Sequence, residues 1–202
     1  MIDKTANTDY QIHEVLKKRW SPRAFKDKPI ETEKIKNMLE AARWSPSSSN
    51  EQPWRFIIGL HGDDTYQKIY NILVKFNQKW AGTAPVLMLA VGYAQSKKEP
   101  GEPSKIYKYD VGQAVAHLTF QATADGLYVH QMGGLKKKKA ALVFEVPKEY
   151  KVLTAIAVGY IGNPEVLPPR MAKSEYKVRE RQNLKEMVFA ERFGQNPDFL
   201  HK

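Results

Sequence analysis

Two arginines and a serine lie within five residues near the N-terminus, in the segment Arg19-Trp20-Ser21-Pro22-Arg23. A guanidinium presents a rigid fork of N–H donors that matches the oxygens of a phosphate, and hydrogen bonds between ionised groups are stronger than neutral ones. The segment therefore predicts a phosphate site. The alternative is the C-terminus of a helix, where cations complement the negative end of the helix dipole. The spacing alone leaves both interpretations open.

A second polar segment runs from Pro46 to Trp54 and reads Pro-Ser-Ser-Ser-Asn-Glu-Gln-Pro-Trp. It supplies hydroxyls, amides and backbone donors between two prolines that stiffen the chain, which is what the polar edge of a planar ligand requires. The alternative is a serine-rich linker. The segment lies between a predicted helix and a predicted strand, which favours the binding loop.

Two shorter patterns lie further along the chain. Met132-Gly133-Gly134 follows a predicted strand, and adjacent glycines let backbone N–H groups approach a ligand closely, although an ordinary tight turn has the same composition. Arg179 and Arg181 are two residues apart, so both side chains point the same way in an extended segment. A solvated charged tail is the alternative for this pair.

The composition limits the kinds of protein that the chain can be. It has 202 residues and no cysteine, so we expect a single domain over residues 1–202, without disulfides or thiolate metal sites. We find no secretory signal and no run of about 18 apolar residues, and we expect a cytoplasmic protein without a membrane span.

The formal charge of +10 attracts anions such as nucleic acids, acidic membranes or phosphorylated small molecules, although a solvated surface rich in lysine has the same charge. No DNA-binding motif is present and the basic residues are dispersed, so we expect no nucleic-acid partner. The five histidines show no metal-ligand spacing, and we expect no metal. They are His13, His61, His117, His130 and His201.

Hydrophobic periodicity predicts the elements that position these segments. Helices are expected over 10–20, 31–44, 65–80, 109–125 and 183–189, and strands over 55–60, 85–91, 127–131 and 152–158. Residues 93–104 are rich in Lys, Glu, Pro and Gly, and we expect a mobile loop that could act as a lid. Few strands with long helices predict an α+β fold, a three-layer α/β/α sandwich. A Rossmann domain is disfavoured because no G-x-G-x-x-G follows a first strand.

The order of these motifs resembles the nitroreductase family of FMN enzymes over residues 10–190. The resemblance is carried by Arg19-x-Ser21-x-Arg23-x-Phe25, Ala41-Ala-Arg-Trp-Ser-Pro46-Ser-Ser-Ser-Asn50-Glu-Gln52-Pro53-Trp54, Asp110-x-Gly112-x-Ala114, Gly126-Leu127, Met132-Gly133-Gly134, Ala157-x-Gly159-Tyr160 and Arg179-x-Arg181. It implies a nitroreductase-like FMN-binding fold whose extended termini are exchanged across a homodimer, with FMN at the dimer interface.

The resemblance also implies a role for each candidate residue. Arg19, Ser21 and Arg23 would hold the phosphate and ribityl end of FMN, and Arg23 would also reach the pyrimidine edge of the ring. Arg179 and Arg181 would bind the phosphate as well. The ring side of the site would comprise Pro46, Ser47, Ser48 and Asn50 from the partner chain, the Gly133 N–H facing the flavin N5 between Met132 and Gly134, and Gln113 as a further ring contact.

The implied activity is an FMN-dependent transfer of electrons from NADH or NADPH, by a ping-pong scheme, to a nitroaromatic, a quinone or a similar flat acceptor. No side chain is expected to be catalytic, because FMN would carry the chemistry. The alternative is a protein of the same fold that binds or handles flavin without physiological nitroreductase activity. The run Lys136–Lys139 is expected to be solvated surface, with preference for a phosphorylated donor such as NADPH as the alternative. His130, on the strand that leads to Gly133, is the one histidine that we single out for its position.

Overall fold

The computed structural model describes residues 3–96, 98 and 101–200. Its centre is a four-stranded sheet with the order β1-β2-β4-β3, in which all neighbours are antiparallel. The strands are β1 (Trp54–Leu60), β2 (Val86–Tyr93), β3 (Tyr128–Met132) and β4 (Tyr150–Gly159). The four predicted strands are therefore confirmed, with bounds that differ by one to two residues. Strand β2 is buried over seven of its eight residues, which explains why residues 85–91 read as a continuous apolar run.

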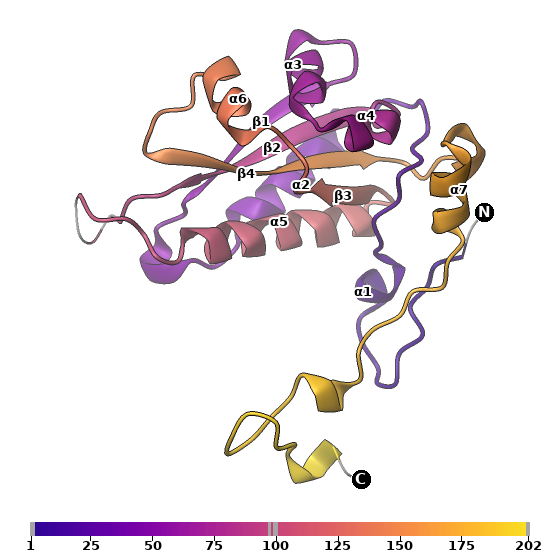
Figure 1. The fold of residues 1–202 in the computed structure, drawn as a ribbon, viewed down its shortest axis with the longest axis vertical. Helices are drawn as coiled ribbons and strands as arrows, with labels where there is room; N and C mark the ends of the chain where they lie inside the picture. Colours follow the sequence, from indigo (N-terminus) through magenta and orange to yellow (C-terminus); the bar gives the residue numbers. More distant parts are fainter. Residues whose placement is uncertain (1–2, 97, 99–100, 201–202) are drawn as a thin grey trace.

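Helices cover both faces of the sheet, and the predicted three-layer α/β/α sandwich is confirmed (Figure 1). One face carries α3 (Asp64–Ile72), α4 (Lys75–Ala81) and α6 (Lys137–Val143), and the other carries α2 (Thr32–Arg43) and α5 (Tyr107–Ala124). Side chains alternate along β2, so Leu87 and Leu89 belong to the first core while Met88 and Ala90 belong to the second. This is the period of two that a strand imposes on its two faces.

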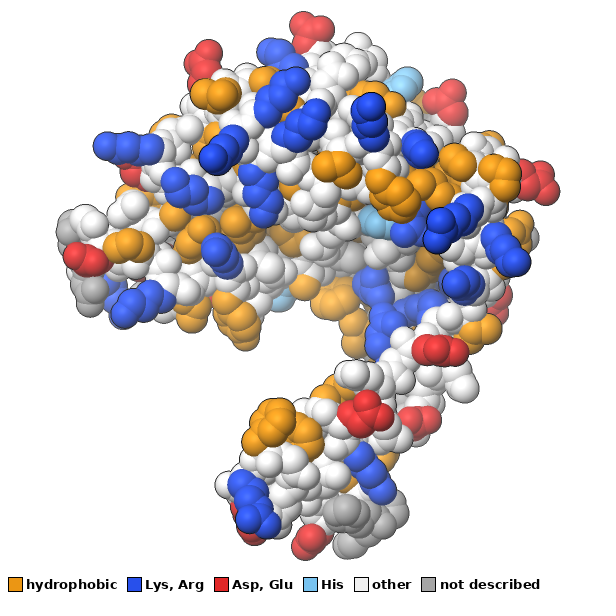
Figure 2. All heavy atoms as spheres, viewed as in Figure 1, with side chains coloured by type: hydrophobic (Ala, Val, Ile, Leu, Met, Phe, Trp, Pro, Cys, Tyr) orange, Lys and Arg blue, Asp and Glu red, His pale blue; other side chains and the backbone are white. Residues whose placement is uncertain are grey.

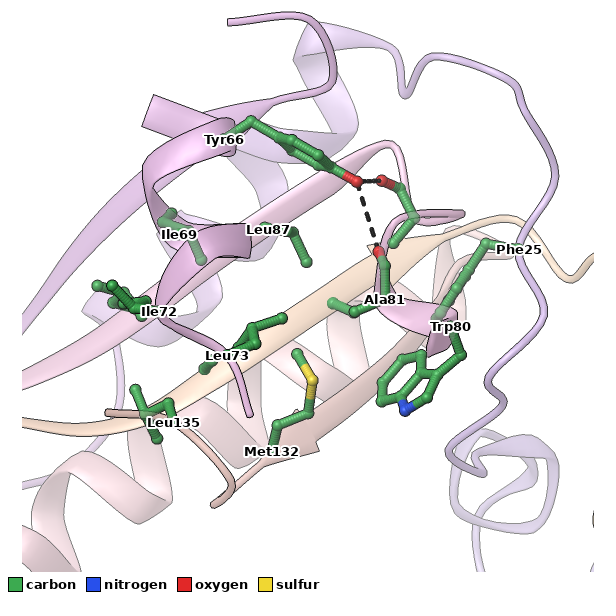
Figure 3. Close-up of a cluster of buried hydrophobic side chains, with 14 of the residues drawn as sticks. Phe25, Tyr66, Ile69, Ile72, Leu73, Trp80, Ala81, Leu87, Met132 and Leu135 are labelled. Atoms are coloured by element: carbon green, nitrogen blue, oxygen red, sulfur yellow. Dashed lines mark hydrogen bonds between the residues drawn. The ribbon is translucent and has the colours of Figure 1, made fainter. Parts of the chain in front are cut away.

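The first core holds Phe25, two residues after the predicted phosphate site Arg19–Arg23, in one position. The Phe25 ring stacks on Trp80, with ring centroids 6.5 Å apart, and the two residues are only 4 % and 1 % exposed. Figure 3 shows both rings in the same core as Tyr66, whose hydroxyl donates to the Ala84 carbonyl at 2.7 Å. A stack of two buried rings two residues after Arg23 restricts where that arginine can lie.

Three predicted helices differ from the structure. The helix expected over 10–20 is reduced to α1 (Glu14–Lys18), with Ile12 and Leu16 each 37 % exposed. The helix expected over 65–80 is divided into α3 and α4, because Leu73 pairs with Leu135 and the Val74 N–H donates to the Gly134 carbonyl. The helix expected over 183–189 is only a 3-10 turn, η3 (Leu184–Glu186).

Other elements were not predicted from the sequence. They are α6, α7 (Pro169–Glu175) and the 3-10 turns η1 (Ser48–Asn50), η2 (Pro164–Val166) and η4 (Asp198–Leu200). The predicted loop over 93–104 is closed at its base, where Gln95 pairs with Pro103 and the Ser104 N–H donates to the Ala94 carbonyl. Its residues 97, 99 and 100 lie outside the described residues, so its role as a lid stays a prediction.

Residues 177–200, here called the C-terminal arm, run away from the body of the domain alongside the N-terminal segment (Figure 1). The arm exposes large apolar side chains, with Phe193 93 % and Phe199 67 % accessible. Arg179 joins the two chain ends, because its Nη1 donates to the Lys4 carbonyl at 2.7 Å and to the Lys17 carbonyl at 2.8 Å. Among the described residues, no helix combines the length and apolar character needed to cross a bilayer.

Candidate cofactor site

A cavity of about 340 Å³ lies where the C-terminal arm leaves the body, and Lys and Arg side chains gather there (Figure 2). We call it the arginine cavity. It is lined by Lys4, Arg19, Trp20, Ser21, Arg23, Ser174, Glu175, Lys177, Val178, Arg179 and Arg181. The structure therefore brings together all five residues that were assigned to the phosphate end, although about 155 residues of sequence separate the two groups.

Local structure places Arg19 and Arg179 side by side in this cavity. Arg19 is the C-cap of α1, and its extended backbone turns the chain out of the helix. The Lys17 carbonyl in the last turn of α1 has no partner within the helix, and Arg179 supplies one. The helix C-terminus that was the alternative to a phosphate site is thus present, but the cation that satisfies it comes from the other end of the chain.

The guanidiniums repel one another where they meet. Burial, and then the nearby Arg181 charge, lower the pKa of Arg19. Burial, followed by the charges of Arg19 and Arg181, lowers the pKa of Arg179. Glu175 is the one carboxylate that lines the cavity, among the residues that the structure describes. Cations that are held together at a cost in free energy form a site for an anion.

The buried carboxylate of Glu175 holds the Ser21-Pro22-Arg23 turn in place. The Arg23 backbone N–H donates to Glu175 Oε2 at 2.9 Å, and its guanidinium lies 3.4 Å from Oε1. Glu175 is 1 % exposed. The Arg23 Nε is buried and has no hydrogen-bond partner in the described part of the chain. This nitrogen is a donor that a ligand could satisfy.

His130 supports the same turn from the sheet. Its Nδ1–H donates to the Pro22 carbonyl at 2.8 Å, and its ring lies 4.4 Å from the Trp80 ring, between centroids. Burial lowers the pKa of His130 to about 4, and the Arg23 charge acts in the same direction. The ring is therefore neutral at pH 7 and acts as a fixed donor to the turn. His130 does not line the arginine cavity itself but bonds to the turn that does, so its role is to position that turn.

The Pro46–Asn50 loop lies elsewhere in the chain. The Ser48 N–H donates to Oδ2 of the buried Asp110, near the start of α5. In contrast, α1 lines a groove with residues 117–124 at the other end of α5. Eleven residues of helix separate Asp110 from Gln121, a distance of about 16 Å along the axis. One chain therefore does not bring Pro46, Ser47, Ser48 and Asn50 to the arginine cavity.

The backbone of this loop is held in an uncommon conformation. Ser49, Asn50 and Gln52 all have positive φ angles, between 51° and 56°. Each such residue costs free energy that the rest of the fold must offset. The Ser47 hydroxyl accepts from the Gln52 N–H at 3.0 Å and helps to fix the shape. The loop is thus preformed, as the sequence-based interpretation of a binding loop requires.

The two glycines after β3 differ from each other. Gly133 is exposed, and a Cβ built on it would meet nothing within 4 Å. A Cβ on Gly134 would lie 2.8 Å from the Asn77 side chain and 2.9 Å from Val74. Met132 is buried, and its carbonyl accepts from the Thr154 hydroxyl at 2.9 Å. The space beside Gly133 is therefore open, whereas the neighbouring side chains leave no room for a Cβ at Gly134.

A second cavity, of about 300 Å³, lies beside this turn, and we call it the lysine cavity. It is lined by Lys108, Val111, Gly112, Val115, Gln131, Lys137, Leu153 and Thr154. Gln113, the predicted ring contact, is half-buried on α5 and lines neither this cavity nor the arginine cavity.

Comparison with known proteins decides the family. The model of the nitroreductase family matches residues 16–79 and 60–160, which is most of the chain and includes the Arg19–Arg23 segment, the Pro46–Asn50 loop and Gly133. This chain belongs to the nitroreductase family.

Similar structures and sequences extend the comparison to the arm. A crystal structure described as an oxidoreductase containing FMN superposes with a TM-score of 0.89 at 30 % identity, covering 97 % of this chain and all of the other. A nitroreductase family protein from Clostridium difficile 630 has a TM-score of 0.71 at 23 % identity, covering 89 % of this chain and 97 % of its own. A protein of Methanothermobacter thermautotrophicus with the provisional name NADH dehydrogenase/NAD(P)H nitroreductase is 26 % identical over 159 residues, 74 % of this chain and 76 % of its own length.

The sequence did not reveal every residue that lines the arginine cavity. Lys4, Ser174, Glu175 and Lys177 line the arginine cavity but were not among the predicted residues. Lys177 and Lys4 carry only the signal of general basicity, and a buried carboxylate such as Glu175 cannot be recognised before α7 is placed. Among the described residues, no group of three or more His, Cys, Asp or Glu could hold a metal. His201 lies outside them.

Proposed function

We propose that this nitroreductase family member is a homodimeric FMN-dependent oxidoreductase that transfers electrons from NADH or NADPH to a flat acceptor such as a nitroaromatic or a quinone. The observation that carries the proposal is the arginine cavity. Cations from both ends of the chain line it, and the single carboxylate among its described lining residues, Glu175, does not neutralise their combined positive charge. A phosphate ester that bears about two negative charges matches this donor set.

The residues present fit FMN. Arg19, Arg179 and Arg181 would hold its phosphate, with the Ser21 hydroxyl as a further donor. The buried Nε of Arg23 is an unused donor beside them, and the proposed ring contact falls at Gly133, where the backbone is open. When bound, FMN would supply the two-electron chemistry that accepts electrons from a nicotinamide and passes them to the acceptor.

The chain's own residues would bind and orient. The guanidiniums would neutralise the phosphate, while Glu175 and His130 keep the Ser21-Pro22-Arg23 turn in place. With a quinone as acceptor the balanced reaction is NAD(P)H, a proton and quinone giving NAD(P)⁺ and hydroquinone. No described side chain has to act as a nucleophile in this scheme, consistent with a chain that has no cysteine.

The ring half of the site would come from a second copy of the chain. The preformed Pro46–Asn50 loop does not reach the arginine cavity within one chain, and the arm leaves the body with exposed aromatic side chains. Both features support a homodimer in which the loop of one subunit completes the site of the other. Such exposed apolar surface on a chain end is typical of an interface.

The first test is the absorbance spectrum of the purified protein, followed by anaerobic titration with NADH and NADPH. We expect a yellow protein with about one FMN per subunit, bleached by at least one nicotinamide and restored by a quinone. A colourless protein that cannot be reconstituted with FMN would contradict the proposal. A protein that holds FMN but consumes no nicotinamide with any quinone or nitroaromatic would instead favour a flavin-handling role.

A further inference from the structure

The lysine cavity lies at a notch in the edge of the sheet. Strand β3 pairs with β4 only over residues 155–159, so the β4 residues Leu153 and Thr154 have no strand beside them on that edge. Lys108 from α5 and Lys137 from α6 line the cavity at this notch, although these two helices cover opposite faces of the sheet (Figure 1). The fold thus brings two cations from different layers to one opening.

The lysine cavity adjoins the backbone that is proposed to face the flavin ring. Gln131 lines it from β3, and Thr154 lines it from β4 while donating to the Met132 carbonyl. The next residue, Gly133, is exposed and open. A molecule that lay against Gly133 would therefore have the lysine cavity beside it.

No carboxylate among the described residues pairs with the two lysines of this cavity. Its other lining residues are apolar or neutral, and in the part of the chain that the structure describes neither Lys108 nor Lys137 has a carboxylate within 4.0 Å. The whole run Lys136–Lys139 is exposed, as predicted, but only Lys137 of the run lines the cavity. The Lys108 Nζ also lies 5.9 Å from the centroid of the Tyr107 ring. Two cations that have no carboxylate partner among the described residues, and that line a small cavity, attract an anionic group.

We propose that Lys108 and Lys137 form a subsite for an anionic group, a phosphate monoester or a carboxylate, on a molecule that exchanges electrons at this site. The inference rests on the proposed function and adds a substrate class to it. A cavity of about 300 Å³ is at the small end of ligand pockets and suits one part of a larger ligand. The anionic group has two possible sources, the 2′-phosphate of NADPH or an acidic group on the acceptor.

The test compares two double variants of equal net charge. Lys108→Gln with Lys137→Gln removes the subsite, whereas Lys138→Gln with Lys139→Gln removes the same charge from residues that do not line the cavity. We measure kcat/KM for NADPH against NADH with an uncharged quinone, and for 4-nitrobenzoate against nitrobenzene with NADH.

We expect the preference for NADPH over NADH, or for 4-nitrobenzoate over nitrobenzene, to fall about tenfold in the cavity variant, roughly threefold for each lysine. The effect should shrink at about 0.5 M salt, because the lysines are exposed and screened. The control variant should retain the wild-type ratios. A fall for NADPH alone assigns the subsite to the donor, and a fall for 4-nitrobenzoate alone assigns it to the acceptor. Unchanged ratios, or equal losses for the two members of each pair, overturn the proposal.

A binding measurement separates this inference from the proposed function. Isothermal titration calorimetry follows adenosine 2′,5′-bisphosphate against AMP, and 4-nitrobenzoate against nitrobenzene, without turnover. If the protein holds no FMN the proposed function fails, yet the titration still reports on the lysines. The subsite is supported if one anionic probe loses about tenfold in affinity in the cavity variant alone. It is refuted if neither probe distinguishes the two variants.

Discussion

The arginine cavity is lined by residues from both ends of one chain. In contrast, no described residue of the Pro46–Asn50 loop lines this cavity, and the loop is bonded instead to Asp110 near the start of α5. Both regions are fixed in advance. The cavity is held by Glu175 and His130, and the loop by its positive-φ backbone and the Ser47 hydroxyl. The difference supports the proposed dimer, in which one chain would supply the anion-binding half of the site and the loop of a second chain would supply the rest.

The largest expected effect comes from combining two variants, one altered in the arginine cavity and the other in the loop, in a single heterodimer. Arg19→Ala removes a charge-assisted contact and should weaken FMN binding by about 1.5–3 kcal/mol. Ser48→Phe places a large ring on the exposed loop and should block the partner's site. Each variant alone should purify with little FMN.

The two variants are co-expressed with different affinity tags and the heterodimer is isolated. One of its two sites then combines the intact Arg19 of the Ser48→Phe chain with the intact loop of the Arg19→Ala chain. We expect it to hold about half the FMN of a wild-type dimer that is tagged in the same way, measured by flavin absorbance. The heterodimer should stay empty if one chain builds the whole site. Arg192→Ala, on the arm and away from the cavity, is the matched control for the loss of an arginine.

The sequence predicts the local parts of these two regions but not the parts that depend on contacts between distant segments. The Arg19–Arg23 cluster and the polar loop are local in sequence, so residue type and spacing sufficed to find them. Glu175 could not be found, because its burial depends on packing of α7 under Arg23. The break between α3 and α4 was missed for a related reason, since Leu73 and Val74 pair with Leu135 and Gly134 more than 60 residues away. The 10–20 segment has helical periodicity, but Ile12 and Leu16 find too little surface in one chain to bury them.

The pH dependence of stability tests whether the Ser21-Pro22-Arg23 turn is held by a neutral His130 ring. The ordinary pKa of histidine is 6.5, and burial lowers that of His130 to about 4 in the folded state. Above pH 6.5 both states are neutral and the His130 contribution is constant. As the pH falls from 6.5 to about 4, the unfolded chain takes up a proton that the folded chain refuses. The free energy of unfolding should then fall, by on the order of 2–3 kcal/mol in total.

Urea denaturation between pH 7 and pH 4 measures this dependence in the wild type and in His130→Gln. Subtracting the two curves removes the carboxylates that titrate in the same range, and the difference should have its slope between pH 6.5 and 4. His117→Gln, an exposed residue on α5, should give a curve parallel to that of the wild type. A His130→Gln curve that is also parallel to the wild type would mean that the ring is solvated and does not hold the Pro22 carbonyl as a neutral donor.

The smallest expected effect separates packing from binding at the turn after β3. Gly134→Ala forces a Cβ to within 3 Å of Asn77 and Val74, and overpacking of this kind should lower the free energy of unfolding by about 1–3 kcal/mol. Gly133→Ala meets open space and should change stability by less than about 0.5 kcal/mol. If the Gly133 backbone faces the flavin, however, the added methyl should weaken FMN binding, which fluorescence titration would detect. A Gly133→Ala variant that is as stable as the wild type and binds FMN equally well would move the ring contact away from this turn, leaving the arginine cavity as the only part of the site that one chain defines.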